Sequence, residues 1–262
     1  MPTGRSASRA SASGPKSLPR RRFMRPALGL AALALVLTAS GCAVWRMSRS
    51  SELVRRSEPF QQGPAQPALR LLVVGDSTGV GTGASSPAQS VAGRAGQAFP
   101  RLAIENRAAD GARHADVLQQ LQAGGRFDMV LVQVGGNDVM RLGTLDGLQA
   151  QIDEVVRRAR ALAPEVVLMP CGNVGNAPFF FAPLSWWMAQ RSRSLHRYTQ
   201  SAAQRGGARY VNLFHESDDD PFVRDPSLNA SDGLHPGDSG YAVWWQELQT
   251  QAGLAQTLAA AR

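Results

Sequence analysis

The chain has 262 residues, of which 44% are hydrophobic, and a formal net charge of +8. This length and apolar fraction suit one globular domain with an N-terminal extension. The positive charge lies at one end, since residues 1–58 contain 11 lysines and arginines against two acidic residues, whereas residues 59–262 contain 17 against 18. The near-neutral remainder excludes a phosphate-binding face, so no nucleic-acid partner is expected.

The first 45 residues have the composition of a disordered basic N-terminus followed by an export signal or membrane anchor. An arginine cluster at 20–25 precedes an apolar run at 27–37, and Ser40-Gly41-Cys42 follows. These are the parts of an export signal, and the arginine pair also resembles a twin-arginine signal. Two attachments remain open. Cleavage before Cys42 would give a lipoprotein, whereas an uncleaved anchor over residues 27–45 would have about the 20 residues that span a bilayer.

Either attachment predicts an exported protein of the periplasm or cell envelope that contacts the membrane through its N-terminus. Residues 46–67 are polar and end in glutamine, proline and glycine, so we expect a linker there. Residues 68–262 then form the folded domain.

From residue 69 onward, short apolar runs alternate with segments of helical periodicity. The pattern predicts strands at 69–74, 102–105, 129–134, 166–169 and 210–213, and helices at 86–98, 113–122, 145–162, 184–205 and 238–260. Such alternation is typical of an α/β fold with a parallel sheet covered by helices on both faces. Ligands of these folds bind beyond the carboxyl ends of the strands.

Short blocks of glycine and polar residues follow three of these strands and precede the last helix. They are Gly75-Asp76-Ser77-Thr78-Gly79, the segment 106–111 with Gly111, Gly135-Gly136-Asn137-Asp138, and Asp232-Gly233-Leu234-His235-Pro236. Each block alone has the composition of an ordinary turn. An aspartate three residues before a histidine can, however, place a carboxylate beside an imidazole, as catalytic triads require.

In this order and at these strand ends, the blocks resemble those of the SGNH (GDSL-like) hydrolases. The resemblance is carried by Gly75-Asp76-Ser77, Gly111, Gly135-x-Asn137-Asp138 and Asp232-x-x-His235, and it spans about residues 69–245. It implies a flavodoxin-like three-layer sandwich, with a central, mainly parallel five-stranded sheet flanked by helices.

The resemblance also implies a serine esterase or acylhydrolase that cleaves carboxylic esters through an acyl-enzyme intermediate. Ser77 would be the nucleophile, His235 the general base and Asp232 the group that orients His235. The backbone amides of Ser77 and Gly111 and the side chain of Asn137 would form the oxyanion hole. Serine needs such a base and such donors to attack an ester. No metal or cofactor is expected, and the substrate would be a small-molecule or lipid ester.

An aromatic segment after the fourth predicted strand contains Phe179-Phe180-Phe181 and Trp186-Trp187. Three interpretations stay open for it: Phe179, Phe180 and Trp186 line an acyl pocket, the segment touches lipid, or it packs as an ordinary loop and helix. We expect Cys171, which follows an apolar run, to be a buried thiol.

Three other functions compete with the esterase. On the same fold, the protein could be an acetyl esterase or acetyltransferase of cell-envelope glycans, or a non-catalytic binding module. The third is a dinucleotide-binding oxidoreductase, because Gly79-x-Gly81-x-x-Ala84, with Glu105 further on, imitates the dinucleotide fingerprint. That motif should begin at the strand end, whereas Gly79 comes five residues after Val74.

Overall fold

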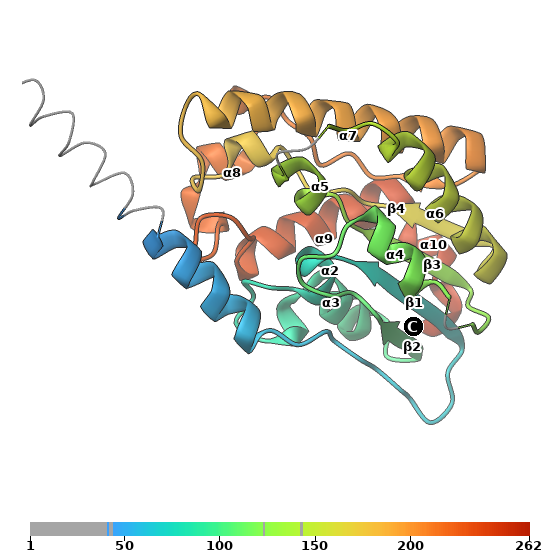
Figure 1. The fold of residues 1–262 in the computed structure, drawn as a ribbon. Coiled ribbons are helices and arrows are strands. Elements are labelled where there is room, and N and C mark those ends of the chain that lie inside the picture. The colour runs from blue at the N-terminus through green and yellow to red at the C-terminus, as the bar shows by residue number, and fades with distance from the viewer. Residues whose placement is uncertain (1–40, 42–43, 123, 142–143) are drawn as a thin grey trace, which may run out of the picture. The chain divides into compact units, whose positions relative to one another are not determined.

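The computed structural model describes residue 41 and residues 44–122, 124–141 and 144–262, and residues 45–262 form one compact unit. Its centre is a parallel five-stranded sheet in the order β2-β1-β3-β4-β5 (Figure 1). The strands are β1 (Leu69–Gly75), β2 (Leu102–Asn106), β3 (Met129–Gln133), β4 (Glu165–Leu168) and β5 (Arg209–Tyr210). The expected α/β class and parallel sheet are confirmed.

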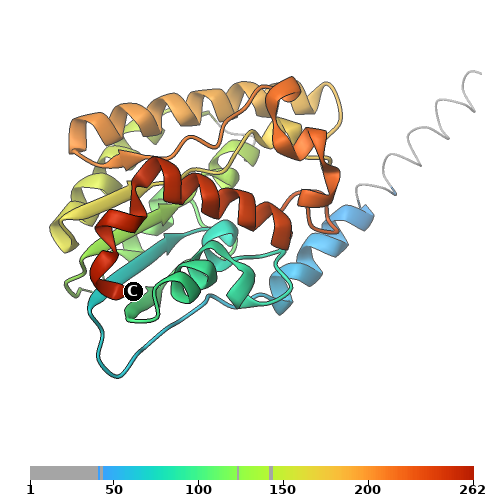
Figure 2. The same cartoon turned by 180° about the vertical axis from the view of Figure 1, so that it is seen from behind.

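Helices cover both faces of the sheet. They are α2 (Ser77–Val80), α3 (Val91–Ala98), α4 (His114–Gln120), α5 (Gly136–Met140), α6 (Leu148–Leu162), α7 (Leu184–Gly206), α8 (Pro221–Arg224), α9 (Asp238–Ala252) and α10 (Leu254–Thr257). Helices α3 and α9 pack together on the face seen in Figure 2. On the other face α4 contacts α6, and α6 contacts α7. The result is the expected three-layer sandwich.

The two central strands end level with each other, and this fixes where the functional loops begin. Gly75 at the end of β1 pairs with Gln133 at the end of β3. The backbones approach so closely that a Cβ at Gly75 would lie 1.8 Å from the Gln133 carbonyl oxygen, and its φ is +151°. Only glycine accepts this conformation and this contact. The segments after β1 and β3 therefore leave the sheet side by side.

The segment expected to be a linker at 46–67 is more ordered than the sequence indicated. Residues 45–56 form a helix, and Gln62 forms an antiparallel bridge with Ile104 beside β2. Half-buried Leu53 and Val54 belong to this helix, and Phe60 packs against the hydrophobic core. These apolar side chains give the segment a surface to bury, so it does not behave as a free polar linker.

Two further elements differ in extent from the expectation. The strand expected at 210–213 is reduced to β5, and the helix expected over 238–260 breaks after Ala252. Gly253 adopts a left-handed conformation with φ +57°, which ends α9 before α10 begins.

The predicted disordered N-terminus, the apolar run at 27–37 and Cys42 lie outside the described residues. Among the helices that the structure does describe, none is long and apolar enough to cross a bilayer.

Candidate active site

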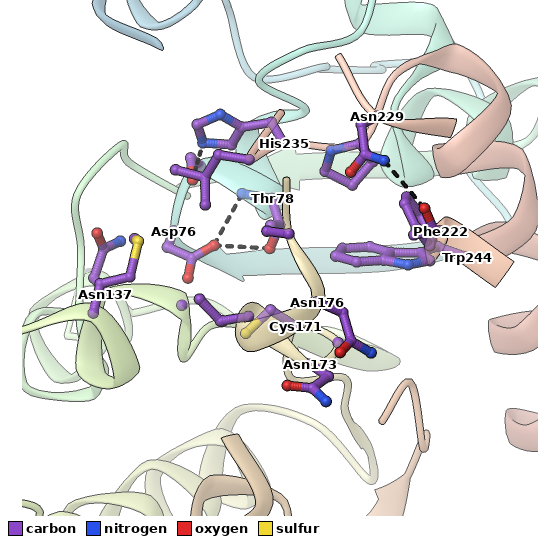
Figure 3. A pocket seen from close by; sticks show the side chains of 18 of the residues that line it. Asp76, Thr78, Asn137, Cys171, Asn173, Asn176, Phe222, Asn229, His235 and Trp244 are labelled. Atoms are coloured by element: carbon purple, nitrogen blue, oxygen red, sulfur yellow. Dashed lines mark hydrogen bonds between the residues drawn. The ribbon is translucent and has the colours of Figure 1, made fainter. Parts of the chain in front are cut away.

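Ser77 is the first residue of α2, in the sharp turn that follows β1. Asp76 caps this short helix, because its Oδ1 accepts hydrogen bonds from the Thr78 amide at 2.9 Å and from the Thr78 hydroxyl at 2.7 Å (Figure 3). The cap fixes the turn and directs the start of α2 toward the pocket. Within the described part of the chain, the Ser77 amide has no hydrogen-bond acceptor, so it is available to a ligand.

His235 lies between Ser77 and Asp232. Its Nε2 is 3.0 Å from Ser77 Oγ, and its Nδ1 is 2.6 Å from Asp232 Oδ2. All three residues are buried. Because the carboxylate accepts the Nδ1 proton, Nε2 is left with its lone pair toward the serine hydroxyl. This is the arrangement in which an imidazole can take the serine proton.

Asp232 is kept ionised by its surroundings. Burial alone would raise its pKa, but the hydrogen bond and charge of His235 outweigh this effect, together with amide hydrogen bonds from Leu234 and His235. These amides donate to Asp232 Oδ1 at 2.9 and 3.1 Å. The net result is a pKa below the usual value of 3.8. The carboxylate is therefore charged and held in place at neutral pH.

Asp76 ties the Ser77 turn to the turn that follows β3. Its second oxygen accepts a hydrogen bond from the Gly135 amide at 3.0 Å, and the side chain is fully buried. Burial raises the pKa of Asp76 against the opposing effects of Thr78, Gly135 and His235. Because both oxygens are occupied in holding loops, this carboxylate is not placed as a base.

Besides Ser77, the predicted oxyanion-hole residues are Gly111 and Asn137, which lie on two adjoining turns. Asn137 is near the start of α5, and its Nδ2 donates to the carbonyl of Ala112 at 3.1 Å, next to Gly111. Gly111 is exposed with φ +77°, and among the described residues nothing accepts a hydrogen bond from its amide. The second N–H of the Asn137 amide is also available, since an amide NH₂ carries two donors.

A pocket opens beside Ser77 and His235, with about 700 Å³ of empty space that includes open solvent. In Figure 3, Asn137 and Trp244 lie at opposite sides of it, with Asp76 and Thr78 between them. Its apolar wall comes from several loops and helices: Met140, Cys171, Val174, Ala177, Phe222, Leu234, Pro236 and Trp244.

The polar side chains of this wall are mostly engaged elsewhere. Asn176 donates to Asp220 at 2.7 Å, while Asn173 donates to the His215 carbonyl at 3.1 Å and accepts from the Gly175 amide at 3.1 Å. Asp220 caps α8. These groups hold the loops together, so the surface offered to a ligand is mainly apolar.

The pocket residues expected from the sequence lie elsewhere. Phe179, Phe180 and Trp186 are not among the lining residues. Phe179 and Phe180 pack edge to face with ring centroids 5.0 Å apart, and Trp186 is 70% exposed. The β4–α7 connection lines the pocket only through residues 171–177, after which it turns outward. Sequence reasoning missed Phe222 and Trp244, and nothing in their local sequence marked them.

Cys171 is a free, buried thiol, as the sequence predicted. It ends the run after β4 and borders the pocket. Burial raises the pKa of this thiol, and the charges of Asp76 and Asp138 raise it further. A thiol held in its neutral form is a weak nucleophile, so Cys171 is not set up to react.

The chain matches the model of the GDSL-like Lipase/Acylhydrolase family over residues 73–243. This match covers most of the chain and contains all four blocks that the structure gathers at the carboxyl edge of the sheet. The chain belongs to this family.

Solved structures share the fold of this GDSL-like hydrolase. The crystal structure of TesA is 20% identical and covers 72% of this chain and 99% of its own, with a TM-score of 0.57. A variant of Axe2, an acetyl xylan esterase from Geobacillus stearothermophilus, is 19% identical over 72% and 96%, with a TM-score of 0.53. A lipolytic G-D-S-L family protein from Veillonella parvula is 12% identical over 69% and 96%, with a TM-score of 0.56. No curated protein sequence matches significantly.

The family match and the structure overturn the dinucleotide-binding alternative. Gly79 lies inside α2, not at the strand end, and Gly81 ends that helix in a left-handed conformation. Gly83 packs against the histidine loop, where a Cβ would lie 2.4 Å from the Pro236 carbonyl oxygen and 2.9 Å from His235 Cβ. These glycines therefore support the turns that carry Ser77 and His235.

Proposed function

We propose that this GDSL-like hydrolase is a serine esterase that works through an acyl-enzyme. The observation that carries the proposal is the continuous hydrogen-bond chain from Ser77 Oγ through the His235 ring to Asp232. Ser77 Oγ attacks the ester carbonyl carbon while His235 Nε2 takes the hydroxyl proton. The C–O bond to the alcohol then breaks, and His235 returns the proton to the departing oxygen.

Water completes the cycle by the same route. The water oxygen attacks the acyl carbon while His235 takes a proton from the water. His235 then returns a proton to Ser77 as the carboxylic acid leaves. During both steps the carbonyl oxygen carries negative charge. The amides of Ser77 and Gly111 and the Asn137 side chain supply donors for it.

The pocket supports an apolar acyl group of moderate size. Its wall is built from aliphatic and aromatic side chains, and its asparagines already bind neighbouring loops. An apolar group that enters it would gain roughly 0.8 kcal/mol per buried methylene. Esters of medium-chain acids, whether free small molecules or lipids, are therefore the substrates that we propose.

A second candidate is the removal or transfer of acetyl groups on cell-envelope glycans. The similarity to the fold of the acetyl xylan esterase Axe2 favours it. An acetyl esterase would turn over acetate esters faster than octanoate esters, and a transferase would need a sugar acceptor. The acyl-chain profile thus separates the two candidates.

We also propose that the protein is exported and attached to the membrane, on the strength of the arginine cluster at 20–25 and the apolar run at 27–37. A Cys42→Ser variant distinguishes the attachments. Loss from the membrane fraction would identify a lipoprotein. Retention there would identify an anchor.

The nucleophile is tested with a fluorophosphonate probe and intact-mass analysis of the full chain. We expect one adduct on the wild type and none on Ser77→Ala, with at least about a thousandfold loss of p-nitrophenyl butyrate cleavage. Ser239→Ala, which changes an exposed serine at the start of α9, is the matched control. It should keep both the probe adduct and the cleavage of p-nitrophenyl butyrate. An adduct that persists on Ser77→Ala would refute the assignment.

A further inference from the structure

Large apolar side chains stand exposed on two segments of the body. We call them the apolar rim: Trp45, Met47, Phe181, Leu184, Trp186 and Trp187, with exposed fractions of 57%, 62%, 59%, 40%, 70% and 39%. The first two belong to the helix at 45–56, and the others to the connection into α7. Scattered exposed apolar residues are ordinary, but a contiguous group marks an interaction surface.

The two segments of the apolar rim meet through Arg46. The Arg46 guanidinium lies 4.5 Å from the centre of the Phe181 ring and donates to the carbonyl of Pro178. Figures 1 and 2 both place the start of the 45–56 helix and the start of α7 at one end of the body, and in Figure 1 α2 lies on the side of β1 that faces this end. This is the end at which the active-site turns leave the sheet.

The apolar rim also borders the active-site pocket. Asn176 and Ala177 line the pocket, and the chain continues directly from them into the exposed segment at 178–187. The amide of Phe179 donates to the carbonyl of Gly233 at 2.9 Å, within the loop that carries Asp232 and His235. The segment that carries Phe181 is thus joined by sequence to one pocket wall and, through Phe179, by a hydrogen bond to the loop of Asp232 and His235.

We propose that the apolar rim docks on a phospholipid bilayer and turns the pocket mouth toward the lipid surface. Tryptophan and phenylalanine are the side chains that partition into the bilayer interface, and an adjacent arginine suits lipid phosphates. The esters hydrolysed would then be drawn from the bilayer. This statement about the source of the substrate rests on the proposed esterase function.

The position of the rim along the chain favours a bilayer over a protein partner. Trp45 follows Cys42 by three residues, and three extended residues span at most about 11 Å. A lipid on Cys42, or an anchor ending near Trp45, would therefore hold the rim at the bilayer. The docking contact then forms at high effective concentration, so even a weak interfacial affinity suffices.

Docking is measured by fluorescence with the full chain reconstituted in phosphatidylcholine vesicles that contain lipids brominated near the headgroup. The difference in quenching between the wild type and Trp186→Phe reports on Trp186 itself, whichever way the N-terminus is attached. We expect strong quenching of that component. An unquenched Trp186 would overturn the proposal, and crosslinking of two chains through the rim would assign it to a second copy instead.

Kinetics give the second readout. The double variant Phe181→Ser/Trp186→Ser should lose at least about tenfold in turnover of an ester embedded in the vesicles, equivalent to about 1.4 kcal/mol. Its cleavage of soluble p-nitrophenyl butyrate should not change. Arg197→Ser, an exposed substitution further along α7, is the control and should leave both rates unaltered.

An equal loss on both substrates, or no loss on either, would contradict membrane docking. If the wild type cleaves neither ester, the proposed esterase function fails, while the quenching experiment still decides whether the apolar rim meets lipid.

Discussion

At the scale of single residues, the site depends on polar side chains that each offer two hydrogen-bonding atoms. Asp76 bonds the Ser77 turn with one oxygen and the Gly135 amide with the other. Asn137 bonds the Ala112 carbonyl and still has an N–H available. In the proposed mechanism, preorganised donors of this kind cost no reorganisation when the oxyanion forms. Removing one of these donors should therefore slow the chemical step and leave substrate binding largely unchanged.

Asn137→Ala is expected to lower kcat for p-nitrophenyl esters by about 10²–10³ and to change KM little. The thermal midpoint should move only slightly, because one hydrogen bond from a half-buried amide contributes about 1 kcal/mol. Steady-state kinetics and thermal unfolding of the same preparation check both statements. A rise in KM with unchanged kcat would show that Asn137 binds substrate without acting on the transition state.

At the scale of elements, the short helix α5 depends on Arg191 of α7. The buried guanidinium donates to the carbonyls of Val139 at 2.6 Å and of Asp138 and Arg141 at 2.8 Å. It also stacks 4.7 Å from the centre of the Trp187 ring. A five-residue helix is unstable alone, so these contacts set the position of α5. Arg191 thereby positions Asn137 without touching the reacting atoms.

Arg191→Met should lower the free energy of unfolding by about 2–4 kcal/mol, because it leaves buried carbonyls without donors. It should also lower kcat more than it raises KM, and Arg191→Lys should restore part of both losses. Chemical denaturation and ester kinetics measure these effects. Arg193→Met is the control, since Arg193 forms an exposed ion pair with Glu216, and we expect a change below about 1 kcal/mol. Equal effects of Arg191→Met and Arg193→Met would contradict this role.

At the scale of the whole molecule, His196 joins the pocket wall to the far edge of the sheet. Its Nε2 lies 2.7 Å from the Cys171 carbonyl oxygen and its Nδ1 lies 2.6 Å from the Tyr210 hydroxyl, on β5. Since a carbonyl only accepts, Nε2 carries the proton in the neutral ring. Burial lowers the pKa of His196 to about 4, with the charge of His215 adding to the effect and the Cys171 hydrogen bond opposing it.

This lowered pKa makes the stability of the protein depend on pH. In the unfolded chain His196 binds a proton with its ordinary pKa of 6.5. In the folded protein the pKa of His196 is about 4, so the ring stays neutral until the pH falls that far. The free energy of unfolding should therefore fall as the pH drops through this window, by up to about 1.4 kcal/mol per pH unit from this group. Asp232, with its lowered pKa, adds its own loss only below about pH 4.

Urea denaturation of the wild type and of His196→Gln between pH 7 and pH 4 measures the contribution of His196. The free energy of unfolding should fall less steeply with decreasing pH in the glutamine variant than in the wild type, although the variant is less stable at pH 7. Parallel curves for the two proteins would mean that His196 does not titrate in this way.

The sequence by itself determined the fold class through local order, and its resemblance to the SGNH hydrolases supplied the candidate triad. Apolar runs that alternate with helical periodicity require a parallel sheet, and the carboxyl ends of parallel strands share one edge. Ser77 and Asn137 had therefore to meet at that edge. Asp232 and His235, three residues apart on one loop, needed no long-range information to be recognised as a pair.

Only the tertiary structure decided what surrounds these residues. Phe222 on α8 and Trp244 on α9 reach the pocket because the fold brings these two distant helices to it. An acyl pocket was one of three interpretations of the sequence around Trp186, and the structure places this side chain on the surface. The helix at 45–56 depends on the body that it packs against. Local pattern reports which residues are apolar, whereas packing between distant segments decides whether an apolar side chain is buried, lines a pocket or stays exposed.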